Sequence, residues 1–532
     1  MGRVDPQRSL LETRWVRRHL VTKGSFYERL ADHGHEIFGD DDFAHLYSEG
    51  QGRPSIPPSV MVRALLCATN DRLFSDRETS RRTRVDADWK AAMGVDDDFE
   101  GIGATTFSLM RARMAVHDAD MALFEATLAK AVRAGIFKAP LTAIIDSSPV
   151  HGAGNVADSY ELIRKMTGRL ARAMGDRLDV EVATEALGLA AAKPDMDWQD
   201  PAVRKAHLGD LVELAAEVLA TAANDAVAMA DPVVAEAARL LAEVVLQDVV
   251  DTGTGPEIAQ GVARDRIVSH SDPEMRHGRK SASRRFDGHK LDVIIDEDSE
   301  LVLGVDVRAG NAGDGEGAAP LLEQVQGIDG IAVDTLLGDM AYSDGDVREA
   351  VEAQGADLVA KVPPVTNAGR FPKTDFTVDL RAGTVTCPAG NITSDARASK
   401  DHKGRRALRF VFDVATCAAC PLRARCTNAK EARSIVIGVH HDRIEAARAA
   451  QSDPETKALL RRRPKVERRI DHLQDLGMRK ARFRGRRKTR LQALLAATVA
   501  NFKRLVVLDA FKISPALAAR NGREAPALVF EP

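Results

Sequence analysis

The residues Leu141-Thr142-Ala143-Ile144-Ile145-Asp146 form a short apolar run that ends in a carboxylate. A short run of this composition is typical of a strand buried inside a sheet. A second apolar run, residues 331–338, ends directly before Asp339. We therefore expect Asp146 and Asp339 at the carboxyl ends of two buried strands, which is where open α/β sheets place their ligand sites.

The segments around these two runs alternate between strand-like and helix-like patterns, which favours an α/β domain. The turn-like residues 297–300 separate two strand-like stretches, so we expect a hairpin there. The expected elements are strands at 289–296 and 301–308, a helix at 316–327, a strand at 331–338, a helix at 343–354, a strand at 357–362, and helices at 442–475 and 488–508.

Other regions flank or interrupt this α/β part. Helical patterns occupy 9–50, 60–70, 75–88 and 106–134, and Gly52-Arg53-Pro54-Ser55-Ile56-Pro57-Pro58 breaks the chain. Ala-rich stretches at 208–229 and 233–250 have the apolar spacing of packed amphipathic helices. We expect a helical N-terminal domain at 1–138, a core built from 139–154, 286–362 and 441–510, a helical insertion at 155–285, a Cys-containing β insertion at 363–440, and a tail at 511–532.

The composition bounds the class of protein. A chain of 532 residues predicts about three or four domains. With 44% hydrophobic and 29% charged residues it can bury a core, and five cysteines are too few for a disulfide scaffold. No apolar run reaches the roughly 18 residues of a membrane span, and the first residues lack the apolar segment of a signal peptide. We therefore expect a reducing cytoplasm.

The formal net charge of −3 argues against a simple basic nucleic-acid binder, but it hides two opposite segments. Residues 179–251 hold 15 Asp and Glu against four Lys and Arg, a net of −11. Residues 461–490 hold 14 Lys and Arg against three Asp and Glu, a net of +11. Because like charges at such density repel, we expect a polyanion to compensate the basic segment, with counterion release from phosphates as the driving force.

Two carboxylates at neighbouring strand ends favour a hard cation such as Mg²⁺ or Mn²⁺, which prefers oxygen ligands. A pair of such ions can activate a water molecule and stabilise the leaving oxygen in phosphodiester displacement. Glu467 is the candidate for a third ligand, and it lies four residues after Arg463, on the same helix face. Five other acids compete for these roles: Asp306 and Asp334, which lie inside expected strands, and Asp158, Asp287 and Asp292.

The chain resembles a bacterial insertion-sequence transposase of the DDE class, close to the group numbered eleven-eighty-two and related to the group numbered four. The matching segments, in chain order, are 52–58 with Ser75-Asp76-Arg77-Glu78, Asp146-Ser147-Ser148-Pro149-Val150-His151-Gly152-Ala153-Gly154, Ser271-Asp272-Pro273-Glu274 with Phe286-Asp287-Gly288-His289-Lys290, Gly338-Asp339-Met340-Ala341-Tyr342, Arg463-Pro464-Lys465-Val466-Glu467, Arg482-Phe483-Arg484-Gly485, and Asn501-Phe502-Lys503-Arg504-Leu505. Each is weak alone, and their order makes the resemblance specific.

The resemblance implies an RNase H-like catalytic core in which Asp146, Asp339 and Glu467 hold Mg²⁺ or Mn²⁺. It implies DNA as the partner, both the terminal inverted repeats and the target, with a homodimer on DNA at the bacterial nucleoid. It also implies that the N-terminal helices recognise the ends. The spacings of 193 and 128 residues between the three acids are long, and the two insertions account for them.

Two positions depart from the pattern of the related group. Leu460 stands where that group has Tyr, and Gln474 stands where it has Lys, so a DNA contact at these positions is in doubt. Lys480 or Arg482 could substitute. The basic residues that we predict to bind DNA are Arg463, Arg479, Lys480, Arg482, Arg484, Arg486, Arg487, Lys488 and Arg490. A second basic cluster, 276–285, is either a tether or a further DNA contact.

Four cysteines form another constellation. Cys417, Cys420 and Cys426 have the spacing C-x₂-C-x₅-C, and Cys387 offers a fourth thiolate. Four thiolates from two short loops suit a tetrahedral structural Zn²⁺, and the alternative is free, reduced cysteine in a small β insertion. We expect Cys67 in the core of a helical region, and we interpret His440-His441 as a strand-end pair.

The predicted function is that of a DNA transposase, which cleaves strands at transposon ends and transfers them into target DNA. Two alternatives stay open. One is a domesticated transposase that binds DNA without catalysis, and the other is an RNase H-like nuclease without strand transfer. For the acidic insertion we expect either shielding of the basic segment or a contact between protomers.

Overall fold

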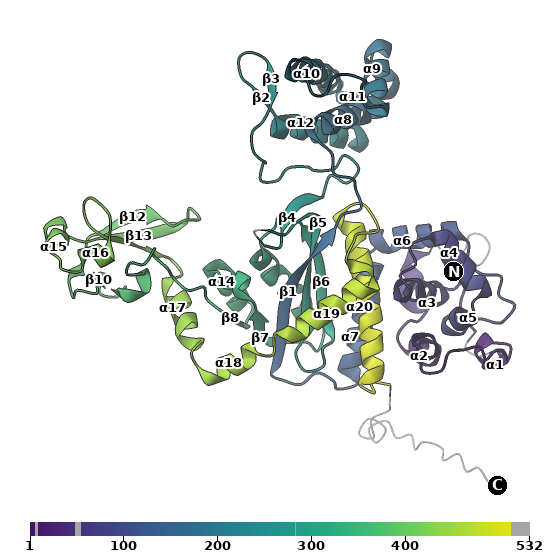
Figure 1. Cartoon of the computed structure of the whole chain (residues 1–532). Coiled ribbons are helices and arrows are strands. Elements are labelled where there is room, and N and C mark those ends of the chain that lie inside the picture. The colour runs from purple at the N-terminus through teal and green to yellow at the C-terminus, as the bar shows by residue number, and fades with distance from the viewer. Residues whose placement is uncertain (6–8, 48–54, 282, 512–532) are drawn as a thin grey trace, which may run out of the picture.

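A computed structural model describes residues 1–5, 9–47, 55–281 and 283–511 of the chain. Part of the predicted chain break, residues 52–54, and residues 512–532 of the predicted tail lie outside the described residues. The structure is mixed α/β, as predicted, with a central mixed sheet (Figure 1).

The central sheet has six strands in the order β4-β5-β1-β7-β8, with β6 beside β5. Strands β1, β7 and β8 run parallel, and β5 is antiparallel to β1, β4 and β6. Because β5 is buried almost throughout from Gly288 onward, both faces of the sheet must be covered. The bounds are β1 Leu141–His151, β4 Arg276–Arg279, β5 Arg285–Asp296, β6 Val302–Ala309, β7 Val333–Gly338 and β8 Asp357–Ala360.

Helices from several parts of the chain pack on this sheet. Helices α19 (Pro464–Leu473) and α20 (Arg486–Val507) lie across it in Figure 1, where α19 contacts β1 and β5 and α20 contacts β6. Helices α13 (Ala318–Gln326) and α14 (Gly345–Glu352) pack against β6 and β8. The predicted alternation of strand and helix from β5 to β8 is therefore confirmed.

The N-terminal region is helical and shares one hydrophobic core with the sheet. Its main helices are α2 Phe26–His33, α3 Pro58–Asn70, α4 Asp76–Val85, α5 Ala87–Met93, α6 Ala104–Val116 and α7 Ala119–Arg133. The prediction of helix throughout 9–50 is wrong, since the described part holds only α1 Thr13–Val16, α2 and two short 3-10 turns. Gly24, with φ +73°, interrupts the chain before α2 in a conformation that favours glycine. Cys67 is fully buried in α3, as predicted.

A bundle of helices with its own hydrophobic core follows β1 and lies at the top of Figure 1. It contains α8 Ser159–Met174, α9 Val180–Ala191, α10 Pro201–Asn224, α11 Ala226–Met229 and α12 Pro232–Asp248, followed by the short strands β2 Val249–Asp251 and β3 Pro256–Ile258. The two predicted Ala-rich helices are present. The first of them begins earlier than expected because Asp200 caps it and Pro201 occupies its first turn.

A small β region lies at the left of Figure 1 and has its own small core. Two three-stranded sheets, β11-β10-β9 and β12-β13-β14, build it. Its elements are β9 Thr377–Asp379, β10 Thr384–Thr386, β11 Ile392–Thr393, β12 Ala396–Lys400, β13 Arg406–Val411, α15 Val414–Ala418, α16 Arg423–Cys426 and β14 Ser434–Gly438. His440 follows β14 and bonds through Nε2 to Asp346 Oδ1 at 2.7 Å.

The predicted helix at 442–475 is three helices, which corrects the expectation. They are α17 His441–Ala450, α18 Pro454–Leu460 and α19. Pro454 and Pro464 each begin a new helix, because proline lacks the N–H that a continuing helix would need. Residues 474–478 form a π-type turn that contains Gly477 at φ +106°, and α20 follows. Among the described residues every helix is too short or too polar to cross a membrane.

Candidate active site

Strand β1 carries Asp146 in its middle, so the prediction that Asp146 ends a strand is wrong. The antiparallel partner β5 continues to pair with β1 as far as His151, which extends the strand beyond the apolar run. The parallel ladder between β1 and β7, however, ends at the pair of Ile144 and Leu337. Asp146 therefore lies just past the point where β1 and β7 separate.

Asp339 directly follows β7, as predicted, and its Oδ1 accepts a hydrogen bond from the Ala341 N–H at 2.8 Å. Asp146 and Asp339 both lie two residues beyond the last ladder pair, Ile144 and Leu337. Because side chains along a strand alternate between the two faces, residues two apart share a face. The register thus brings the two carboxylates to the same side of the sheet.

Glu467 comes from α19, whose buried residues Val466, Ile470 and Leu473 pack toward the sheet. Its side chain is 53% exposed. The Arg463 guanidinium joins it to the sheet, since Nη2 lies 2.5 Å from Glu467 Oε1 and Nη1 lies 3.1 Å from Asp146 Oδ2. Arg463 therefore holds a positive charge between two of the three predicted acids.

Asp146, Asp339 and Glu467 line one polar cavity of about 410 Å³, which we call the carboxylate cavity. The structure thus brings together three acids that lie 193 and 128 residues apart in the sequence. The other residues that line it are Ser147, Ser148, Pro149, Arg279, Lys280, Phe286, Lys290, Asp314, Arg463, Ile470, Asp471 and Gln474.

Burial sets the electrostatics of this region. It raises the pKa of Asp146, and the charge of Asp339 adds to that rise, while the Ser147 N–H and Arg463 oppose it. Beside the cavity, burial raises the pKa of Asp292 to about 6 although Arg308 donates two hydrogen bonds to its carboxylate. Fully buried Tyr342 has a pKa raised first by burial and then by the charges of nearby acids, Asp292 first and Asp146 next.

Sequence reasoning missed two residues of the cavity. Lys290 Nζ lies 2.5 Å from Asp314 Oδ1 and 2.6 Å from the Ala312 carbonyl oxygen, and Ser147 Oγ donates to Asp314 at 2.7 Å. Asp314 comes from the Gly-rich loop after β6, and the sequence of this loop predicts no functional role for Asp314. The sequence carries little signal for Lys290, because strand β5 also holds the polar residues Asp287, His289 and Asp292.

The five competing acids do not line the carboxylate cavity, and each has another partner. Asp306 pairs with Arg490, Asp334 accepts from the Leu141 N–H, Asp158 caps α8, Asp287 pairs with His277, and Asp292 pairs with Arg308. These contacts stabilise the fold around the cavity.

The basic segment 461–490 is largely compensated within the chain, which corrects the expectation that its charges need a polyanion. Ten of its 14 Lys and Arg side chains form ion pairs with described acids, namely Arg462, Arg463, Lys465, Arg468, Arg469, Arg479, Arg482, Arg486, Arg487 and Arg490. Arg461, Lys480, Arg484 and Lys488 have no ion pair with a described residue.

Several predicted DNA-binding residues hold the fold together. Arg482 donates to the Leu73 carbonyl oxygen at 2.9 Å, and burial lowers its pKa to about 10. Arg487 donates to both carboxylate oxygens of buried Asp120 at 2.7 Å. These contacts tie the segment before α20 and the first turn of α20 to the N-terminal helices. A DNA contact of Arg482 in place of a lysine at position 474 stays a prediction. Gln474 itself lines the cavity and donates to Ser148 Oγ at 2.8 Å.

The donor chemistry of the cavity fits a hard divalent cation, since carboxylate oxygens are the ligands that Mg²⁺ and Mn²⁺ prefer. Over the described ranges, no group of three or more His, Cys, Asp or Glu side chains is arranged so that it could hold a metal ion. The Arg463 guanidinium provides the positive charge between Asp146 and Glu467 here.

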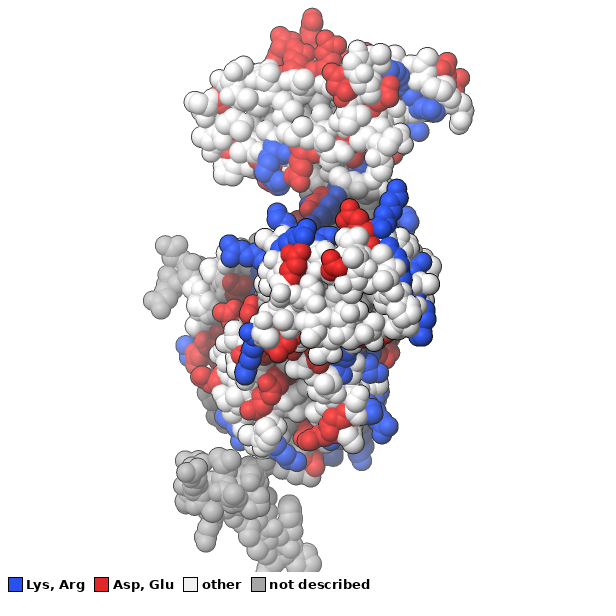
Figure 2. Space-filling model, turned by 90° about the vertical axis from the view of Figure 1, so that its left-hand side faces the viewer, with Lys and Arg blue, Asp and Glu red and all other residues white. Residues whose placement is uncertain are grey.

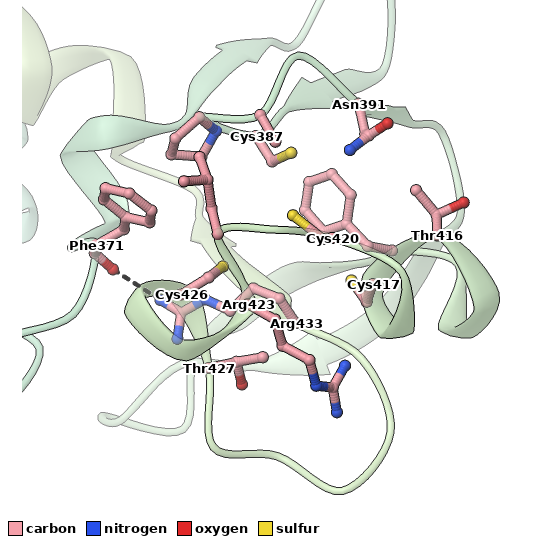
Figure 3. A pocket seen from close by; sticks show the side chains of 14 residues that line it. Phe371, Cys387, Asn391, Thr416, Cys417, Cys420, Arg423, Cys426, Thr427 and Arg433 are labelled. Carbon is pink, nitrogen blue, oxygen red and sulfur yellow. Dashed lines mark hydrogen bonds between the residues drawn. The ribbon is translucent and has the colours of Figure 1, made fainter.

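Cys387, Cys417, Cys420 and Cys426 line a second cavity of about 20 Å³, the thiol pocket (Figure 3). All four thiols are free, and the pocket is walled by Phe371 and Phe412. Burial raises the pKa of Cys426, and the other three cysteines add to the rise. The four predicted cysteines are therefore neighbours, but these described residues are not arranged so that they could hold a metal ion.

Two stretches of the chain match known sequence families. Residues 386–506 match the transposase DDE domain, and residues 16–113 match a transposase domain (DUF772). These matches support an insertion-sequence transposase. The first stretch includes the thiol pocket, Glu467 and most of α20, and the second includes helices α2 to α5. No curated protein and no solved structure matches the chain.

Proposed function

We propose that this chain is a DNA transposase that cleaves one strand at each end of its element and transfers the freed end into target DNA. The observation that carries the proposal is the carboxylate cavity, where Asp146, Asp339 and Glu467 from three separate elements face one polar space. The two transposase matches, at opposite ends of the chain, support the same function.

In the proposed reaction a water oxygen attacks the phosphorus at the transposon end, and the bond from phosphorus to the 3′ oxygen breaks. The freed 3′-hydroxyl then attacks a phosphorus of the target, and the target's own 3′ oxygen leaves. Divalent cations at such a site lower the pKa of the attacking hydroxyl and stabilise the charge on the leaving oxygen. Asp146, Asp339 and Glu467 would hold them.

The chain's own side chains prepare this site. Arg463 fixes the positions of Asp146 and Glu467 through its two short contacts. Lys290 neutralises Asp314, and Ser147 orients it, so this fourth carboxylate is already partnered. The sheet order, with β5 and β6 antiparallel beside parallel β1, β7 and β8, supports an RNase H-like core.

DNA is the partner that this function requires. Of the nine predicted DNA-binding residues, Lys480, Arg484 and Lys488 are exposed and without an ion pair among the described residues, so we assign phosphate contact to these three first. We also propose that the N-terminal helices recognise the ends of the transposon and that the protein binds DNA as a homodimer. In the thiol pocket we propose a structural Zn²⁺ on the four cysteines.

The test is cleavage of a donor plasmid that carries the element's ends, with Mg²⁺ present. Asp339→Asn should abolish cleavage, and Asp357→Asn, at an exposed acid on the neighbouring strand β8, should leave it intact. Survival of cleavage at the wild-type rate in Asp339→Asn would refute the site assignment.

The same assay separates the alternatives. Joining of the cut 3′ end to a target plasmid distinguishes a transposase from a nuclease that only hydrolyses. A wild-type protein that binds the ends but neither cuts nor joins them would indicate a domesticated, non-catalytic descendant.

A further inference from the structure

The carboxylate cavity has two walls that differ in their free charge. Helix α19 lines one side of the cavity, and the end of β4 with the turn that follows it lines another, through Arg279 and Lys280. We call residues 276–285, apart from residue 282, the basic hairpin. Its strands pair in the register Arg276 with Gly288 to Arg279 with Arg285.

The base of the basic hairpin is held by contacts within the protein. His277 Nδ1 lies 2.5 Å from Asp287 Oδ1. Arg276 is half-buried and donates to the carbonyl oxygens of Pro273 and Met275. These contacts fix the hairpin to the edge of the sheet, so its outer end is held in a defined position.

The outer end of the basic hairpin carries free positive charge. Arg279, Lys280, Arg284 and Arg285 are all exposed, and none of the four forms an ion pair with a described residue. Within 461–490, by contrast, ten of the 14 basic side chains are paired. The hairpin is therefore the denser source of uncompensated charge beside the cavity.

The cavity itself shows the same asymmetry. Four cationic side chains line it, and the carboxylates of the cavity neutralise two of them, Arg463 and Lys290. The other two, Arg279 and Lys280, belong to the basic hairpin. A nearby wall with free positive charge would attract a phosphodiester toward the three acids Asp146, Asp339 and Glu467.

The hairpin also joins a wider basic edge. The backbone of residues 479–481 lies alongside His151, where the His151 N–H donates to the Arg479 carbonyl oxygen at 3.1 Å. His151 pairs with Gly288, which pairs with Arg276 of the hairpin. Exposed Lys480 thus lies on the same sheet row as the base of the hairpin. Figure 2 shows Lys and Arg side chains below the helical bundle, with Asp and Glu side chains among them.

We propose that the basic hairpin is a DNA-binding arm, which grips the phosphate backbone of the strand whose phosphodiester lies in the carboxylate cavity. This inference rests on the proposed transposase function. We expect the contacts to be with phosphate groups, because exposed arginine and lysine side chains bind the DNA backbone through its charge, and such contacts do not depend on the base sequence.

The test uses the full-length protein and a short mixed-sequence DNA duplex, with binding measured over a series of salt concentrations. The test variant combines Arg279→Ala, Lys280→Ala, Arg284→Ala and Arg285→Ala. The matched control removes the same amount of positive charge from the small β region. It combines Arg381→Ala, Lys400→Ala, Arg406→Ala and Arg409→Ala, whose native side chains are exposed and form no ion pair with a described residue. Thermal midpoints should stay at the wild-type value in both variants, because all eight side chains are exposed.

Each lost phosphate contact reduces the slope of log affinity against log salt by about 0.9, so the hairpin variant should show a slope shallower by about two to four. At physiological salt its affinity should fall by at least about tenfold, while the control keeps the wild-type slope. A wild-type slope in the hairpin variant, or an equal loss in the control, would overturn the inference. If the hairpin variant fails this test but the wild type cleaves DNA, only the role of the hairpin is refuted and the proposed function stands. If the wild type binds no DNA, the role of the hairpin and the proposed function are both refuted.

Discussion

The carboxylate cavity and the thiol pocket are built in opposite ways. The cavity is open, about 410 Å³, and collects oxygen ligands from strands and a helix that are far apart in the sequence. The pocket is about 20 Å³ and collects sulfur ligands from neighbouring loops of one small β region. Catalytic metal sites keep room for substrate, whereas structural sites are closed by protein ligands. The contrast is the basis for proposing catalysis at the first and a structural role for the second.

The carboxylate cavity and the thiol pocket also differ in the size of the hydrophobic core that surrounds them. A large core that spans the sheet and the N-terminal helices carries Asp146 and Asp339. The small β region around the thiol pocket has only six fully buried apolar residues in its core, with three of the cysteines packed against them. So small a core supplies little stability, and a bound metal would contribute folding free energy there.

The largest expected effect on folding follows from that difference. The double variant Cys417→Ser and Cys420→Ser should unfold the small β region, because it removes two of four thiolate ligands and their packing. Limited proteolysis should then cut within residues 371–435 at least about tenfold faster, with the sheet and the N-terminal helices still protected. The purified wild type should contain about one zinc per chain.

Cys67→Ser is the matched control, since Cys67 is buried in α3 and far in the sequence from the pocket. It should leave the zinc content and the protection of the small β region unchanged. Wild-type protein that is free of zinc and equally resistant to protease after chelation would remove the structural role from the thiol pocket.

A smaller effect concerns the charges beside the carboxylate cavity. Burial raises the pKa of Asp292 to about 6, above the usual 3.9 or so of an unfolded Asp. A raised carboxyl pKa means that the folded state holds the proton more tightly. Relative to a neutral pair, the wild type should therefore lose stability as the pH rises from about 4 to about 6, by roughly 2 to 3 kcal/mol.

The neutral reference is the double variant Asp292→Asn with Arg308→Gln, which keeps hydrogen-bonding groups of similar size. The measurement is the free energy of unfolding of both proteins by urea across this pH range. A difference that stays constant with pH would show that Arg308 holds Asp292 ionised throughout.

The sequence predicts some features of the fold and the site well, for local reasons. Asp339 follows its strand as expected, because an apolar run and its polar end are visible in one segment. Cys417, Cys420 and Cys426 are neighbours, as their short spacing indicated, and Cys387 lies beside them, as predicted. Pro454 and Pro464 also mark the breaks between the last helices, because a proline outweighs the helical periodicity of the residues around it.

Other features depend on partners that the local sequence does not reveal. Asp146 lies mid-strand because the residues that follow it pair with residues of β5 that are 137 to 145 positions further along the sequence. The charges of the basic segment are compensated by acids such as Glu297, Glu300 and Asp120, which come from other regions. Their pairing follows from tertiary packing, so counting charge along the chain overestimates the need for DNA.

The central claim is that Asp339 is a metal ligand in the carboxylate cavity, and ligand softness tests it most directly. In Asp339→Cys a thiolate replaces the carboxylate, and Mn²⁺ tolerates that ligand better than Mg²⁺ does. We predict that donor-plasmid cleavage by this variant is lost in Mg²⁺, by roughly a thousandfold, and is partly restored in Mn²⁺. Cleavage in Mg²⁺ at the wild-type rate would contradict the account.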